Sequence, residues 1–171
     1  MLFRPATSDD LDTLNALVES AYRGDSARRG WTHEADLLDG QRTDREALAE
    51  TIADPAQHLL VADDEGTLAG CICVTEKPGA LAYVGLVTVD PARQGGGLGR
   101  DLLDAGEAAA RAAGATRAEM TVIRQRAELI AWYERRGYAL TGERRPFPHG
   151  DARFGLPKTD ALEFVVLEKP L

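Results

Sequence analysis

The stretch "DPARQGGGLGRDLL", Asp90 to Leu103, places four glycines in five positions directly before an amphipathic helical pattern. Glycine is costly to order and offers no side chain for packing, so this density needs a reason. A glycine-rich turn from a strand into a helix gathers backbone N–H groups at the positive end of the helix dipole. Such a turn suits a phosphate group. The stretch therefore predicts a phosphate cradle.

Three phosphate-binding patterns compete for this loop. The P-loop pattern requires Lys-Ser/Thr after its last glycine, but Arg100 and Asp101 follow Gly99. The dinucleotide pattern Gly-x-Gly-x-x-Gly requires a glycine as its sixth residue. That residue is Arg100 when the pattern starts at Gly95 and Leu102 when it starts at Gly97, so both registers fail. The third pattern, Gln/Arg-x-x-Gly-x-Gly/Ala, fits residues 94–99 completely.

Periodicity around the loop predicts a mixed sheet. An antiparallel meander comes first, and crossover units with right-handed geometry follow it. At 171 residues, the chain is most simply one domain, residues 1–171. Thr32 is expected to cap a turn over residues 33–40. The expected strands are an entry strand at 2–7, then 58–64, 67–77, 80–90, 115–123, 138–143 and 161–171, and the expected helices are 8–21, 44–54, 98–113 and 126–136.

Two segments together resemble the GNAT superfamily of acyl-CoA-dependent N-acyltransferases. "YVGLVTVDPARQGGGLGRDLL" is similar to that superfamily's strand, pyrophosphate loop and helix, and "AELIAWYERRGY" is similar to its later helix signature. The order of elements extends the resemblance to essentially the whole chain. It implies an α/β (α+β) fold: a mixed, mainly antiparallel central sheet of about seven strands, flanked by four helices.

The resemblance also implies how acetyl-CoA binds as co-substrate. Backbone N–H groups of the glycine loop and Arg100 would hold the pyrophosphate, and the strand edge before the loop would pair with the pantetheine arm. A backbone N–H near Leu86 or Val87 would face the thioester carbonyl. Arg93 and Arg100 either add charge or are solvated. The expected cofactor-binding residues are Leu86, Val87, Thr88, Val89, Gln94, Gly95, Gly96, Gly97, Leu98, Gly99, Arg100 and Arg126.

The implied chemistry is direct attack of a neutral amine on the thioester. Tyr133 matches the position of a tyrosine that protonates the leaving sulfur; the alternative is core packing beside Trp132. Arg126 stands where the superfamily commonly has Asn, so it either reaches a phosphate or is solvated. Strand 80–90 has no carboxylate before Asp90. The candidate general bases are, in order, a water chain, Glu34 and Glu76.

Two segments are expected to form the acceptor site, because both combine aromatic and polar residues. The first supplies Trp31, Thr32 and Arg42, and the second supplies Phe147 and Phe154. Alternatively, the aromatic residues only plug the ends of the sheet. Arginines at 42, 145 and 153 hint at an acceptor that carries a carboxylate.

Charge and composition narrow the partners. The net charge of −8 argues against bulk binding to nucleic acid or an anionic membrane. The chain shows neither a signal-peptide layout nor an apolar run of roughly 20 residues, so a cytoplasmic location is expected. Cys71 and Cys73 are expected as reduced, buried thiols, and the three histidines are too dispersed in sequence to predict a metal site. The chain is expected to be a monomer or a homodimer.

The sequence therefore predicts an acetyl-CoA-dependent N-acetyltransferase that acts on a primary amine of a small molecule. Two alternatives remain at this point: a catalytically degenerate module that binds or senses acyl-CoA, and a protein or peptide N-acetyltransferase.

Overall fold

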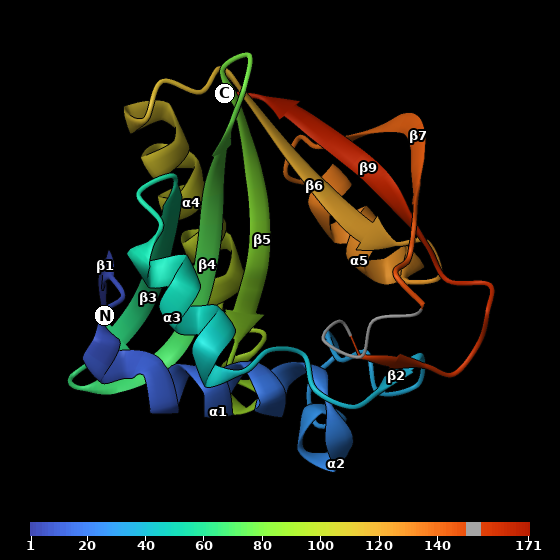
Figure 1. Cartoon of the computed structure of the whole chain (residues 1–171), viewed down its shortest axis with the longest axis horizontal. Helices are drawn as coiled ribbons and strands as arrows, with labels where there is room; N and C mark the ends of the chain where they lie inside the picture. The colour runs from blue at the N-terminus through green and yellow to red at the C-terminus, as the bar shows by residue number, and fades with distance from the viewer. Residues whose placement is uncertain (150–154) are drawn as a thin grey trace.

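A central seven-stranded sheet organises the chain in the computed structural model, which describes residues 1–149 and 155–171 (Figure 1). All neighbouring strands are antiparallel except β5 and β6, as the meander and crossover pattern predicted. In spatial order the strands are β1 (Leu2–Pro5), β3 (Gln57–Asp64), β4 (Thr67–Lys77), β5 (Leu81–Val89), β6 (Arg117–Ile123), β9 (Glu163–Pro170) and β7 (Ala139–Pro146).

Helices cover both faces of this sheet. α1 (Leu11–Tyr22) and α3 (Arg45–Ala53) bury an apolar side against one face, together with Cys71 and Cys73, which are free thiols as predicted. α4 (Leu98–Ala112) and α5 (Ala127–Glu134) pack in the core of the other face. The expectation of a mixed sheet flanked by four helices is thus confirmed; a further one-turn helix, α2 (Gly24–Ala27), follows α1.

The sheet opens between β5 and β6. These strands pair only where Leu81–Tyr83 meets residues 117–119, and they then diverge, so that the sheet splits into two halves (Figure 1). Near the end of this pairing β5 carries a bulge, because its register against β4 shifts between Cys71 and Cys73. Leu86, in the bulge, has a φ of 52°. The opening exposes an edge of β5 directly before the glycine loop.

The segment after α2 differs from the expectation. Thr32 begins no helix: its hydroxyl accepts a hydrogen bond from Gln94 Nε2 at 2.8 Å and is therefore unavailable as a cap. The chain instead runs into β2 (Leu38–Asp39), which pairs with β8 (Leu156–Pro157) in a separate ribbon. Among the described residues, no helix is long and apolar enough to cross a membrane.

Candidate active site

The glycine loop turns β5 into α4 and leaves its backbone donors exposed. Gly95 and Gly97 have φ values of 88° and 90°, which side-chain-bearing residues rarely adopt, and Gly97 is the N-cap of α4. Within the described chain, the backbone N–H groups of residues 95–99 meet no hydrogen-bond acceptor. Five consecutive donors at a helix N-terminus form an anion site, so the loop fits a pyrophosphate.

One part of the prediction for this loop needs correction. The Arg100 N–H donates to Gly97 O at 3.0 Å, because α4 has already begun there, so it is not a further cradle donor. The guanidiniums of Arg100 and Arg93 pair with Asp101 and Asp64 at 3.0 and 2.7 Å at the surface, and both arginines line the cavity beside the loop, so their charge near the phosphates stays a prediction. The cavity beside the loop is lined by the glycines at 95, 97 and 99 but not by Gly96.

This cavity, here called the loop cavity, has a volume of about 220 Å³. Arg136 lies over the Trp132 ring in its wall, 3.5 Å from the ring centroid, and the buried Arg136 Nε has no hydrogen-bond partner in the described part of the chain. The sequence analysis missed this cation; the arginine pair in "YERRGY" was its only signal. Burial, together with Arg135 and Arg100, lowers the pKa of Arg136.

Trp31 and Thr32 line the loop cavity, not the acceptor site predicted for them. The cause is Gln94, whose side-chain oxygen accepts from Trp31 N at 2.9 Å while its amide nitrogen donates to Thr32 Oγ1. Trp31 also packs on Trp132, with ring centroids 6.3 Å apart. The Gln94 side chain therefore fastens this segment to the glycine loop, and its amide nitrogen also donates to Val89 O at 3.3 Å, across the turn itself.

A second cavity, here called the inner cavity, has a volume of about 250 Å³ and lies in the opening between β5 and β6. Arg42 and Phe147 line it, as predicted for an acceptor site, whereas Phe154 lies outside the described residues. Arg145 lies elsewhere and is bound to Glu119 and Glu143. The two cavities share five lining residues: Tyr22, Val87, Leu129, Arg126 and Tyr133.

Tyr133 stands at this junction with an unengaged hydroxyl. Its ring is buried between Trp132 and Tyr138, at centroid distances of 5.0 and 5.9 Å. Its hydroxyl forms no hydrogen bond with a described residue, and Tyr133 lines both cavities. Burial raises the pKa of Tyr133, so the phenol stays protonated at neutral pH. Tyr133 therefore packs in the core with its ring and lines both cavities as well.

The bulge in β5 sets the direction of the Val87 N–H. The carbonyl of Leu86 accepts from Cys71 Sγ of β4 and from Thr88 Oγ1 of β5 itself. Because C=O and N–H point in opposite directions across a trans peptide, the Val87 N–H points away from these two side chains. Tyr22, which the sequence analysis missed, donates its hydroxyl to Val87 O and braces the bulge. The Thr88 side chain is buried and lines neither cavity, so the pairing predicted for this residue concerns its backbone alone and stays a prediction.

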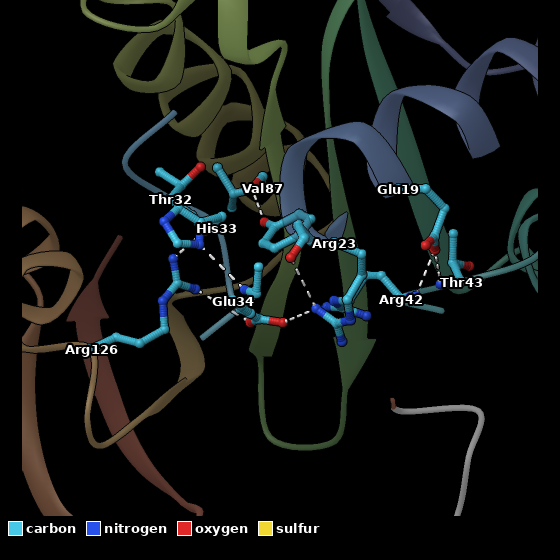
Figure 2. A network of polar contacts seen from close by, with 11 residues as sticks. Glu19, Arg23, Thr32, His33, Glu34, Arg42, Thr43, Val87 and Arg126 are labelled. Atoms are coloured by element: carbon cyan, nitrogen blue, oxygen red, sulfur yellow. Dashed lines mark hydrogen bonds and ion pairs between the residues drawn. The ribbon is translucent and has the colours of Figure 1, made fainter. Parts of the chain in front are cut away.

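Glu34 lies in a buried charge network (Figure 2). Its carboxylate accepts from Arg23 at 2.5 Å and from Arg126 at 3.3 Å, and Arg126 also donates to Thr32 O. Burial alone would raise the pKa of Glu34, but Arg42, Arg126 and Arg23 lower it below its ordinary value. A carboxylate held by guanidiniums is a weak base, so the structure contradicts Glu34 as a general base.

The same network engages Arg126, whose guanidinium is shared between Glu34 and Thr32. Arg126 is therefore neither solvated nor free to reach a phosphate; it joins the walls of the two cavities. Glu76 pairs with His58 at 2.7 Å and, among the described residues, lies outside both cavities. Of the three predicted bases, only the water chain is compatible with this geometry.

Comparison with known proteins gives a consistent result. The Acetyltransferase (GNAT) family matches residues 18–138. An IAA acetyltransferase of Azospirillum brasilense is 34% identical over 124 residues, which cover 71% of this chain and 73% of that protein. A mycothiol acetyltransferase of Salinispora arenicola is 37% identical over 142 residues, 80% of this chain; the chain spans only 43% of that relative.

A solved structure supports the fold assignment. A protein of Salmonella typhimurium, solved with its cofactor acetyl-CoA, superposes with a TM-score of 0.73 at 19% identity, over 100% of this chain and 94% of that one. The resemblance inferred from the two sequence segments is confirmed. The chain belongs to the GNAT family and is an acyl-CoA-dependent acetyltransferase, with CoA as the carrier of its co-substrate.

Proposed function

We propose that this enzyme transfers the acetyl group of acetyl-CoA to a primary amine of a small molecule, by direct attack. The observation that carries the proposal is the meeting of two cavities at Val87 and Tyr133. The loop cavity would receive acetyl-CoA, with its pyrophosphate on residues 95–99. The inner cavity would receive the amine.

Arg136 would add charge on the donor side. It is the cation of the loop cavity that has no carboxylate partner among the described residues, whereas the guanidiniums of Arg93 and Arg100 have one each. CoA carries phosphate groups, and a guanidinium binds phosphate through charge-assisted hydrogen bonds. We therefore assign Arg136 to the binding of CoA.

The reaction has one bond-forming and one bond-breaking stage. The lone pair of the neutral amine attacks the thioester carbon, a C–N bond forms, and the Val87 N–H stabilises the oxyanion of the tetrahedral intermediate. The nitrogen loses its proton to water. Collapse of the intermediate breaks the C–S bond, and the sulfur takes a proton from Tyr133, which is later reprotonated by solvent. The products are the N-acetylated amine and CoA.

The aromatic lining of the inner cavity favours a small molecule over a protein as the acceptor. Phe147 is buried in a cluster with Leu38, Ile123 and Leu162, and it closes one wall of the inner cavity. Tyr83 and Phe164 lie in other parts of the lining. These aromatic walls suit a compact ligand with an apolar body.

The test is CoA release from acetyl-CoA with a panel of small amines, together with mass spectrometry of the acetylated product. Tyr133→Phe should lower kcat by about 100-fold while acetyl-CoA still binds, because general acid catalysis typically contributes a factor of this size or more. Tyr138→Phe is the matched control: its hydroxyl bonds Glu107 and it lines neither cavity, so its kcat should be close to wild type.

Acetyl-CoA binding without turnover of any amine would contradict the proposal and favour a sensing module. Acetylation of peptide N-termini in preference to every small amine would also contradict it. Equal losses in Tyr133→Phe and Tyr138→Phe would refute the role of Tyr133 as the acid.

A further inference from the structure

The inner cavity carries an excess of positive charge. Its lining includes the guanidiniums of Arg23, Arg42 and Arg126, but among the described lining residues only one carboxylate, that of Glu34. Three positive charges against one negative charge leave an excess of two. The lining also includes three phenols, those of Tyr22, Tyr83 and Tyr133. Such a cavity favours an anionic ligand.

The three arginines are not equivalent. Arg23 and Arg126 hold the Glu34 carboxylate directly, at 2.5 and 3.3 Å. The Arg42 guanidinium lies over the Tyr22 ring, 5.3 Å from its centroid; its charge lowers the pKa of Glu34, but it forms no direct ion pair with any described carboxylate. Arg42 is thus the cation of the inner cavity that has most capacity to bind a ligand.

The backbone at Arg42 is fixed in place. Glu19 accepts the Arg42 N–H at 2.6 Å and the Thr43 N–H at 2.8 Å, and Figure 2 shows this contact on the side of the network opposite Arg126. Glu19 itself does not line the inner cavity. The backbone of Arg42 is therefore held beside the cavity by contacts that a ligand would not need to break.

Tyr22 relates Arg42 to the reaction centre. The Tyr22 hydroxyl donates to Val87 O, and its ring lies beneath the Arg42 guanidinium. One phenol ring thus separates the guanidinium from the bulge where transfer would occur. A ligand that binds Arg42 at one end and places its amine at Val87 must carry an anionic group and an amine in one compact molecule.

We propose that the acceptor is an amine that also carries a carboxylate, and that Arg42 binds this carboxylate. The inference rests on the proposed function, whose acceptor class it narrows. A planar guanidinium matches a carboxylate through two parallel hydrogen bonds, and the apolar body of the ligand packs against Phe147 and Phe164. Arg42 selects the acceptor and takes no part in proton transfer.

The test compares amines that differ only in the carboxylate: L-phenylalanine with L-phenylalaninamide, and 4-aminobutyrate with 4-aminobutanamide. The amide of the first pair has the less basic amine, so the chemistry of attack favours the amide and any preference for the acid must come from binding. At least one acid should exceed its amide about 10-fold or more in kcat/KM. Arg42→Gln should abolish that preference through KM, and Arg45→Gln, an exposed arginine paired with Asp12, should retain it.

A second readout needs no turnover. In the presence of CoA, calorimetric titration with 3-phenylpropanoate should show binding to wild type and to Arg45→Gln, and about 10-fold weaker binding to Arg42→Gln. 3-Phenylpropanamide should bind weakly to all three proteins. If no amine is acetylated, the proposed function fails and this titration alone decides the assignment of Arg42.

Three results would overturn the inference. One is that wild type acetylates the amides as efficiently as the acids. Another is that Arg42→Gln keeps the preference for the acid. The third is that 3-phenylpropanoate binds no better than its amide, or binds equally to wild type and Arg42→Gln.

Discussion

Substitution of Gly97 by alanine tests whether the glycine loop is a ligand site or only a turn. Its φ of 90° costs an alanine roughly 1–2 kcal/mol of folding stability. The added Cβ would lie 3.3 Å from Arg100 Nη2, so the loop or the guanidinium must also shift. A shift that removes one charge-assisted hydrogen bond to a phosphate weakens CoA binding by about 10- to 150-fold.

Two alanine substitutions serve as controls. Gly66 has a φ of 89° in the β3–β4 hairpin, with no atom within 4 Å of its Cβ position, so Gly66→Ala should lose similar stability but bind CoA normally. Gly96 lies in the loop without a positive φ, so Gly96→Ala should change neither property appreciably. Urea unfolding and calorimetry with CoA measure the two effects. Normal CoA affinity in Gly97→Ala, with only the stability loss of Gly66→Ala, would refute the assignment.

Three further predictions follow from named contacts. Gln94→Ala removes the hydrogen bonds that join Gln94 to Trp31 and Thr32. Tryptophan fluorescence should therefore change, and the KM for acetyl-CoA should rise by about 10-fold. An unchanged KM would refute the role of Gln94 in fastening this segment. Because burial raises the pKa of Tyr133, kcat/KM should increase with pH as the amine loses its proton and should not fall again below about pH 10; a decline near pH 8 would require another acid. The hydrogen bond from Arg4 lowers the pKa of Asp10 from 3.8 to about 2, which stabilises the fold by about 2 kcal/mol above pH 4, and this stabilisation is lost as the pH falls towards 2. The urea-unfolding difference between wild type and Asp10→Asn should therefore shrink between pH 4 and pH 2, and a constant difference would contradict the linkage.

Local patterns were sufficient for most of the fold. Apolar runs bounded by turn residues predicted β3, β4 and β5, and glycines mark the start of α4 at Gly97 and the turn after it at Gly114. The family resemblance then supplied the expected sheet and the role of the loop. The short β2–β8 ribbon was missed, because two-residue strands leave no periodic signal.

The acceptor side was predicted less well, because its geometry depends on contacts between distant residues. Hydrogen bonds with Gln94, more than 60 positions later in the sequence, hold Trp31 and Thr32 at the loop cavity. The pKa of Glu34 is lowered by Arg42, Arg126 and Arg23, of which Arg126 lies 92 positions away in the sequence. The composition of the segment around Trp31 showed an aromatic and polar surface correctly, but it could not show which of two cavities that surface would line.

A crystal structure with CoA bound tests the central claim most directly. The account predicts that the pyrophosphate oxygens lie about 3 Å from backbone N–H groups of residues 95–99, and that the sulfur lies within about 4 Å of both the Tyr133 hydroxyl and the Val87 N–H. The inner cavity should remain open beyond the sulfur. A pyrophosphate bound away from the glycine loop, or a sulfur remote from Tyr133, would contradict the account.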